Sequence, residues 1–248
     1  MCYSADADPP IEPIEGGASS HEDLVLATTD GNRFAAFAAT SADSKGPGVV
    51  ILPDVRGLHH FYEELALRFA EHGYDALAID YFGRTAGVGK RGEEFAYTEH
   101  VPRTTLKGVT ADTAAAISRL RKDDTERAIF TVGFCFGGSN SWHQAAAGHG
   151  LAGAIGFYGN PKRPPLGPIE RVTEYACPIL ALMGGDDPGI PNEVVEEFRQ
   201  ALDAADIENE VVIYSDAPHS FFDRQQDKFA AESADAWKRT LEFIAGHS

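Results

Sequence analysis

A cysteine between two glycines, at the end of an apolar run, is the feature of the sequence best suited to covalent chemistry. The segment Gly133-Phe134-Cys135-Phe136-Gly137 has the pattern G-x-C-x-G, which is typical of a sharp strand-to-helix turn that exposes a nucleophile. Such a turn is strained, and glycine avoids the clash that a Cβ would make with neighbouring backbone. The dipole of the following helix favours a thiolate, and the Phe136 N–H is placed to donate to an oxyanion. We therefore predict that Cys135 attacks a carbonyl carbon.

The three cysteines of the chain differ in their surroundings. The alternative interpretation of Cys135 is an inert core thiol, because free cysteine is among the most buried residue types. Cys2 lies near the N-terminus and Cys177 precedes Pro178 at the start of an expected strand, so we assign no chemistry to either. An odd number of widely spaced cysteines is typical of a reducing compartment rather than of a disulfide framework.

A nucleophile on such a turn requires an acid and a histidine later in the chain, each on a loop that follows a strand. Two adjacent carboxylates, Asp186 and Asp187, follow the apolar run 178–183. His219 follows the apolar run 211–214 and is the only histidine in the expected position. Spacing alone leaves open which of the two acids orients the imidazole of His219.

Short apolar runs alternate with longer amphipathic stretches, which is typical of a parallel sheet with crossover helices. We predict an α/β fold whose mostly parallel sheet of about eight strands has helices on both faces. The expected strands are 24–27, 33–39, 48–52, 75–81, 128–134, 151–157, 178–183 and 210–214. The clearest helical periodicity covers residues 61–72 and 105–121.

The ends and connections of these elements carry further predictions. Residues 1–20 are rich in Pro, Gly, Ser and acidic side chains and are expected to form an extended arm, with a single domain over 21–248. Asp30-Gly31 predicts a type I′ hairpin turn between the first two strands, so the sheet should begin antiparallel. Residues 83–100 form the longest expected irregular stretch, and such loops are usually functional.

Composition and charge narrow the function classes. There are 21 Lys and Arg against 38 Asp and Glu, a net charge of −17, which disfavours nucleic acid and anionic membrane surfaces as partners. The sequence contains no H-E-x-x-H motif, paired-cysteine motif, G-x-G-x-x-G or Walker pattern after a strand, so we expect neither metal nor cofactor. Without a leader-like or membrane-spanning apolar run, we expect a cytoplasmic protein.

The order of these motifs resembles the dienelactone hydrolase family, α/β-hydrolases with a cysteine nucleophile. The resemblance covers nearly the whole chain and rests on the segments 133–138, 184–191 and 218–221. It implies a triad of Cys135, His219 and Asp187, because the register of the 184–191 loop selects Asp187 over Asp186. The same resemblance implies that Val55, after Pro53-Asp54, supplies the second oxyanion N–H beside that of Phe136.

The resemblance also implies substrate-binding positions. Asp54 stands where the type enzymes have a glutamate that holds the resting thiol, and Arg84 matches an arginine that pairs with the substrate carboxylate. The second family arginine is displaced by one position, to Arg224, and Asp223 occupies its place. A surface position is the alternative for Arg84. Tyr158 is a further candidate that could line the pocket or fill the core.

These observations predict a carboxylic ester hydrolase that cleaves an ester or lactone through a thioester acyl-enzyme, of the carboxymethylenebutenolidase type. The expected partner is a small-molecule ester or lactone, and the chain is expected to be a monomer or a small homo-oligomer. A carboxylesterase for bulkier neutral esters, with residues 83–100 as a lid, is the first alternative. A ligand-binding protein that kept the fold without catalysis is the second.

Overall fold

The computed structural model describes residues 7–42, 45–223 and 225–248, and their contacts divide the chain into two compact units. The first unit ends at Ile129 and contains β1 (Ala18–Ala27), β2 (Arg33–Ser41), β3 (Gly48–Leu52), α1 (His60–Glu71), β4 (Asp75–Ile79), α2 (Gly83–Ala86), α3 (Tyr97–His100), the 3-10 helix η1 (Val101–Arg103) and α4 (Leu106–Leu120). The second unit contains nearly all of β5 (Ile129–Phe134), then α5 (Phe136–Gln144), β6 (Gly153–Phe157), the 3-10 helix η2 (Pro168–Glu174), β7 (Ile179–Gly184), α6 (Asn192–Ala204), β8 (Asn209–Tyr214) and α7 (Ala230–Gly246).

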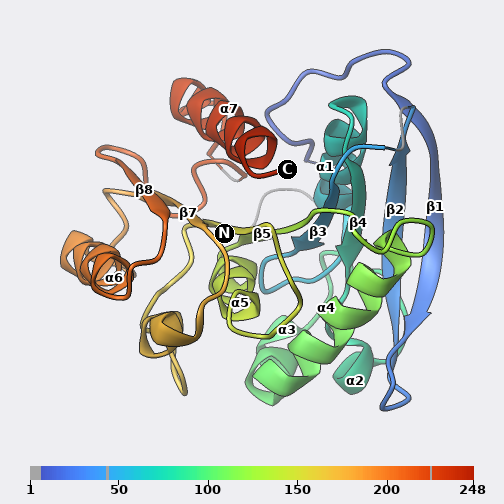
Figure 1. Cartoon of the computed structure of the whole chain (residues 1–248), viewed down its shortest axis with the longest axis horizontal. Coiled ribbons are helices and arrows are strands. Elements are labelled where there is room, and N and C mark those ends of the chain that lie inside the picture. Colours follow the sequence, from blue (N-terminus) through green and yellow to red (C-terminus); the bar gives the residue numbers. More distant parts are fainter. Residues whose placement is uncertain (1–6, 43–44, 224) are drawn as a thin grey trace. The chain divides into compact units, whose positions relative to one another are not determined.

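The strands of the first unit lie in the order β1-β2-β4-β3. β1 pairs with β2 and β2 pairs with β4, both antiparallel, whereas β3 and β4 are parallel. The prediction that the sheet begins antiparallel is therefore confirmed, and parallel pairing begins with β3, whose first residue is Gly48. All five residues of β3 are buried, and helices α1 and α4 cover opposite faces of these strands (Figure 1).

The strands of the second unit, β5, β6, β7 and β8, are neighbours in sequence order and all pair in parallel. Helix α7 lies on one face and helices α5 and α6 lie on the other (Figure 1). Each of β5, β6 and β7 is buried along its whole length, as expected for strands covered on both faces. This arrangement brings the carboxyl ends of four strands to one edge, where open α/β sheets bind ligands.

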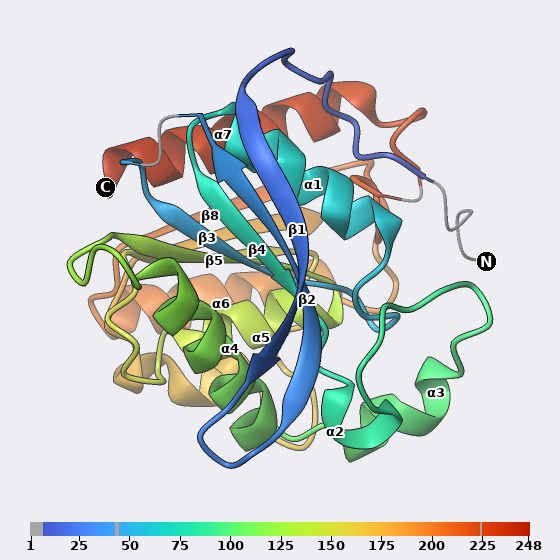
Figure 2. The same cartoon turned by 90° about the vertical axis from the view of Figure 1, so that its right-hand side faces the viewer.

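The hairpin of β1 and β2, seen face on in Figure 2, turns differently from the prediction. Gly31 has a φ of 85° but Asp30 does not have a positive φ, so the type I′ turn is wrong. Instead, the N–H of Gly31 donates to the carbonyl of Thr28, and the N–H of Thr28 donates to Asn32. This is a three-residue loop in which glycine takes the left-handed position, a common alternative to the two-residue turn.

The stretch 83–100 is more ordered than predicted, since it contains the short helices α2 and α3. Four-residue helices are too short to give a periodic apolar pattern, which is why the sequence did not indicate them. A buried ion pair fixes the stretch: Arg91 Nη2 lies 2.7 Å from Asp80 Oδ2, and the Asp80 side chain is fully buried. The Arg91 N–H also donates to the carbonyl of Leu58 at 2.7 Å.

The N-terminal boundary also differs, because β1 begins at Ala18, inside the range 1–20 that was predicted as an arm. A single domain over 21–248 stays a prediction. In the part of the chain that the structure describes, none of the helices combines the length and apolar character needed to cross a bilayer. The cytoplasmic location stays a prediction as well.

Candidate active site

Cys135 occupies the turn between β5 and α5. Its φ is 54° and its ψ is −111°, a conformation that L-residues adopt only where the surrounding structure enforces it. The Cys135 N–H donates to the carbonyl of Phe157 at 3.0 Å, and the Ser139 N–H donates to the carbonyl of Cys135 at 3.2 Å. The thiol is partly exposed, so the strained turn presents it to the exterior as the motif predicts.

Two glycines make this turn possible. A Cβ on Gly133 would lie 1.9 Å from the carbonyl oxygen of Gly137, and a Cβ on Gly138 would lie 2.7 Å from the carbonyl oxygen of Phe157. Neither backbone group can move aside without breaking the strand or the helix start. The chain therefore needs glycine at 133 and 138 for steric reasons, and the steric role predicted for Gly133 is confirmed, whereas that of Gly137 stays a prediction.

Asp187 and His219 lie on loops that follow β7 and β8. The His219 Nδ1 is 2.6 Å from Asp187 Oδ2, and the Gly189 N–H donates to Asp187 Oδ1 at 2.9 Å. The Asp187 side chain is 3% exposed, whereas Asp186 is exposed and uses its backbone N–H to bind the carbonyl of Ala217. Asp187 is thus the acid that contacts the imidazole.

The electrostatics of His219 depend on both neighbours. Burial by itself would lower the pKa of His219, but the hydrogen bonds to Asp187 and Cys135 outweigh it and raise the pKa to about 10. Because Nδ1 binds Asp187, Nε2 is the nitrogen left to face the sulfur.

Burial raises the pKa of the Cys177 thiol to about 12, so this cysteine stays a neutral thiol. The other cysteine without assigned chemistry, Cys2, lies outside the described residues.

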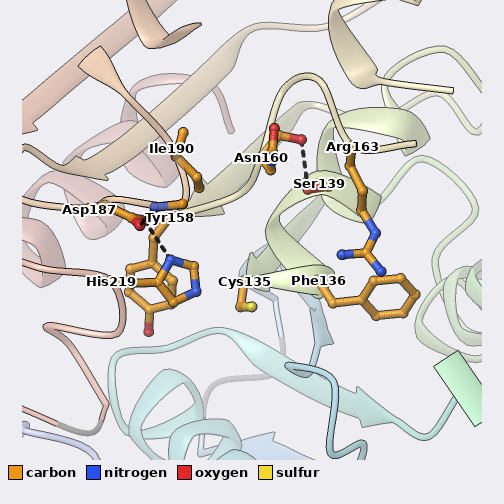
Figure 3. A pocket seen from close by; sticks show the side chains of 10 residues that line it. Cys135, Phe136, Ser139, Tyr158, Asn160, Arg163, Asp187, Ile190 and His219 are labelled. Carbon is orange, nitrogen blue, oxygen red and sulfur yellow. Dashed lines mark hydrogen bonds and ion pairs between the residues drawn. The ribbon is translucent and has the colours of Figure 1, made fainter. Parts of the chain in front are cut away.

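A pocket of about 290 Å³ joins these groups (Figure 3). The residues lining it are Cys135, Phe136, Ser139, Tyr158, Asn160, Arg163, Asp187, Gly189, Ile190 and His219. Tyr158 packs against the imidazole, with 5.1 Å between the ring centroids of Tyr158 and His219. Tyr158 therefore lines the pocket, and its side chain is also fully buried. The sequence had suggested either a pocket position or a core position, and the structure combines the two.

The predicted oxyanion donors belong to different units. Phe136 is the first residue of α5, and the first N–H groups of a helix have no partner within the helix. Val55 lies in the first unit, between β3 and α1, and its part in the site stays a prediction. Beside it, Asp54 is buried and both of its carboxylate oxygens bind Arg56, with Nη2 2.8 Å from Oδ2 and the backbone N–H 2.7 Å from Oδ1.

The roles predicted for Arg84 and Arg224 in binding a substrate carboxylate stay predictions. Arg84 already binds two carboxylates, since its Nη1 is 2.7 Å from Asp30 Oδ2 and its Nη2 is 3.0 Å from the buried Asp112. To bind a substrate carboxylate, Arg84 would have to exchange these partners. Arg224 lies outside the described residues.

The sequence analysis did not single out five pocket residues, namely Ser139, Asn160, Arg163, Gly189 and Ile190. Asn160 and Arg163 lie just after β6, in a segment rich in proline that carries no motif. Their position after the carboxyl end of a parallel strand was the signal that could have found them.

Comparisons with known proteins identify relatives of this chain. The protein-family model described as "Dienelactone hydrolase family" matches residues 34–248 of this chain. An Escherichia coli K12 protein named "Putative carboxymethylenebutenolidase" is 32% identical, and the match covers 87% of this chain and 83% of that protein. The carboxymethylenebutenolidase of Rhodococcus opacus is 27% identical over 98% of this chain and 96% of its own. A crystal structure from Klebsiella pneumoniae named "Putative Dienelactone Hydrolase" superposes with a TM-score of 0.80 at 28% identity, covering 92% of this chain and 99% of that chain.

Proposed function

The chain belongs to the dienelactone hydrolase family and is a carboxylic ester hydrolase, and we propose that it works through a Cys135, His219 and Asp187 triad with a thioester acyl-enzyme. The observation that carries the proposal is the 2.6 Å contact between His219 Nδ1 and Asp187 Oδ2, in the same pocket as the Cys135 thiol. A nucleophile, a base and a group that orients the base are the three parts that such catalysis needs.

In the acylation step His219 Nε2 holds or removes the proton of the Cys135 thiol, and the raised pKa of His219 favours holding it. The sulfur then attacks the carbonyl carbon of the ester or lactone, and the negative charge develops on the carbonyl oxygen. The Phe136 N–H, at the N-terminus of α5, stabilises this oxyanion, with the Val55 N–H as the second donor. The carbon–oxygen bond breaks as His219 returns its proton to the leaving oxygen.

Deacylation repeats these transfers with water. His219 accepts a proton from the water molecule whose oxygen attacks the thioester carbonyl, and the carbon–sulfur bond breaks as the Cys135 sulfur regains a proton. Asp187 fixes the tautomer of the imidazole and stabilises the imidazolium form throughout, which is consistent with the raised pKa of His219, about 10 despite its burial. No group outside the chain, the substrate and water is needed to balance these steps.

A lactone of the carboxymethylenebutenolide type is the substrate class we propose first, because two of the relatives carry that activity in their names. A specific observation favours the second candidate, a carboxylesterase for neutral esters. Arg84, which the resemblance assigns to the substrate carboxylate, binds the carboxylates of Asp30 and Asp112 instead. A small-molecule ester or lactone is the partner in either case.

The test is hydrolysis of a dienelactone beside a short neutral p-nitrophenyl ester, by wild type, Cys135→Ala and Arg84→Ala. Cys135→Ala should lose both activities. Selective loss of the lactone activity in Arg84→Ala would support the lactonase, whereas a wild-type preference for the neutral ester that ignores Arg84 would support the carboxylesterase. Slow, ordinary alkylation of Cys135 by iodoacetamide, together with inactivity on both substrates, would favour a non-catalytic binding protein.

A further inference from the structure

Asn160 places a side-chain amide in the pocket that the proposed mechanism does not use. It is the third residue after β6, and it lines the pocket together with Cys135. A primary amide has one oxygen, which accepts hydrogen bonds, and one NH₂ group, which donates them. The contacts of Asn160 within the chain therefore decide which of these two groups a substrate meets.

The oxygen of the Asn160 amide is engaged by the backbone of its own turn. The Lys162 N–H donates to Asn160 Oδ1 at 2.8 Å, which is the Asx-turn pattern typical of asparagine. Because a backbone N–H needs an acceptor, this contact also fixes which end of the amide is oxygen and which is nitrogen. The NH₂ group, Nδ2, is then the end of the side chain that is left to face a ligand.

The position of Asn160 relative to the nucleophile is fixed by helix α5. The Ser139 hydroxyl, in the first turn of α5, donates to the Asn160 carbonyl at 3.0 Å. A Cβ on Gly159 would lie 2.7 Å from the Ser139 backbone nitrogen, so the two backbones are in direct contact. Because α5 begins directly after Cys135, the same helix holds the turn of Asn160 and presents the thiol. The amide is thus held in place before a substrate binds.

The Asn160 NH₂ group has no acceptor among the residues that the structure describes. Two other polar groups of the pocket are committed to contacts within the chain, since the Ser139 hydroxyl binds the Asn160 carbonyl and Asp187 binds His219. The Asn160 side chain is half-buried, so an apolar group placed against Nδ2 would leave an N–H unpaired. An uncharged amide does little to offset the desolvation of an anion, and a neutral oxygen is therefore the acceptor that matches it.

The position of Asn160 in the pocket decides which part of a substrate it meets. Figure 3 shows Asn160 beside Ser139, away from His219, with the Cys135 thiol between the two sides. His219 must protonate the leaving oxygen, so the leaving group lies on the His219 side. The acyl part, which stays attached to the sulfur, then extends toward Asn160.

We propose that Asn160 is a specificity-determining residue whose Nδ2 donates a hydrogen bond to a neutral oxygen on the acyl part of the substrate. The preferred esters or lactones are thus those whose acyl group carries an oxo group beyond the scissile carbonyl. This inference rests on the proposed function, because it needs Cys135 as the acylated atom and His219 as the proton donor to the leaving group.

The experiment compares matched pairs of neutral esters. p-Nitrophenyl 4-oxopentanoate and p-nitrophenyl 5-oxohexanoate carry an oxo group at two positions of the acyl part, and p-nitrophenyl pentanoate and hexanoate are their references. 4-Acetylphenyl pentanoate carries the oxygen on the leaving group instead, with phenyl pentanoate as its reference. After correction for uncatalysed hydrolysis, the ratio of kcat/KM within each pair cancels any effect of a variant that is common to both esters.

The variants are Asn160→Asp and Asn160→Leu. Asn160→Asp keeps the shape of the side chain and an oxygen for the Lys162 N–H, but it replaces the NH₂ donor by an acceptor. In both variants the ratio for at least one of the two oxo positions should fall about 3- to 10-fold, which is the size of one neutral hydrogen bond. The leaving-group ratio should stay near the wild-type value.

Asn192→Asp is the matched control. It makes the same amide-to-carboxylate change at the exposed first residue of α6, which does not line the pocket, so all three ratios should stay near the wild-type values. Unchanged ratios at both oxo positions in Asn160→Asp, or an equal fall of the leaving-group ratio, would overturn the role of Asn160. If Asn160→Leu does not fold, Asn160→Asp decides alone, because it keeps the turn. If wild type hydrolyses none of the esters, the proposed function itself fails, and that outcome is distinct from the others.

Discussion

Asp187→Asn separates the chemical role of Asp187 from its structural one. Both carboxylate oxygens are engaged, since the Gly189 N–H donates to Oδ1 at 2.9 Å and His219 Nδ1 lies 2.6 Å from Oδ2. In Asp187→Asn the amide oxygen should stay on the Gly189 N–H, because an NH₂ group there would face another donor. The NH₂ group is then directed at His219 Nδ1, which must become an acceptor.

The cost of this change follows from the position of the proton. With Nδ1 as acceptor, the imidazole proton moves to Nε2, the nitrogen that has to accept the proton of the Cys135 thiol. The wrong tautomer in a hydrolase triad lowers turnover by about 10⁴-fold. We therefore expect kcat/KM to fall about 10³- to 10⁴-fold, which corresponds to about 4 to 5.5 kcal/mol of transition-state stabilisation. The fold should persist, because Asn and Asp have nearly the same shape.

The assay is hydrolysis of p-nitrophenyl acetate, with far-UV circular dichroism as the measure of folding. Asp186→Asn is the matched control, because it makes the same charge change at the neighbouring exposed residue and should keep a kcat/KM near that of wild type. Wild-type turnover in Asp187→Asn, together with loss of turnover in Asp186→Asn, would refute the assignment of the triad acid.

Three further predictions follow from the same geometry. Cys135→Ser should fold, but its ester turnover should fall about 10²-fold or more, because the site is arranged for a more acidic thiol; equal steady-state rates would argue against a dedicated thiolate site. Gly133→Ala should lower the unfolding free energy by about 3 kcal/mol or more in urea titrations, since its Cβ would lie 1.9 Å from the Gly137 carbonyl oxygen. Gly246→Ala, where a Cβ has nothing within 4 Å, is its control and should be neutral or slightly stabilising. The folded-state pKa of His219 is raised from 6.5 to about 10, so the stability of wild type over His219→Gln should be greatest below pH 6.5 and shrink as the pH rises through 10. Urea titrations across that range measure the difference, and a constant difference would contradict the raised pKa.

The regular elements could be predicted from the sequence where the apolar pattern is long. Each of the eight predicted strand ranges overlaps one strand of the structure, and the range 48–52 agrees with β3 at both ends. The triad positions could be predicted for a related reason, since each follows a strand and carries a residue type with defined chemistry. The choice of Asp187 over Asp186 required the family resemblance, and the contact with His219 agrees with it.

The features that the sequence did not indicate depend on contacts between distant residues. Whether Asp30 takes a positive φ depends on how the strands close the hairpin, and the dipeptide alone suits more than one turn. The order of the stretch 83–100 depends on a buried pair between Arg91 and Asp80, which are 11 residues apart. Arg163 enters the pocket because Asn160 and Ser139 hold its turn, and no local pattern encodes that arrangement.

The most direct test of the central claim is to trap the acyl-enzyme. Wild-type protein is mixed with p-nitrophenyl acetate, quenched in acid within the first turnover, digested and examined by mass spectrometry. We predict a mass increase of one acetyl group on the peptide that contains Cys135, with no such increase in Cys135→Ala. Steady turnover without acylation of Cys135, or acylation of another residue that is chemically and kinetically competent, would contradict the proposed mechanism.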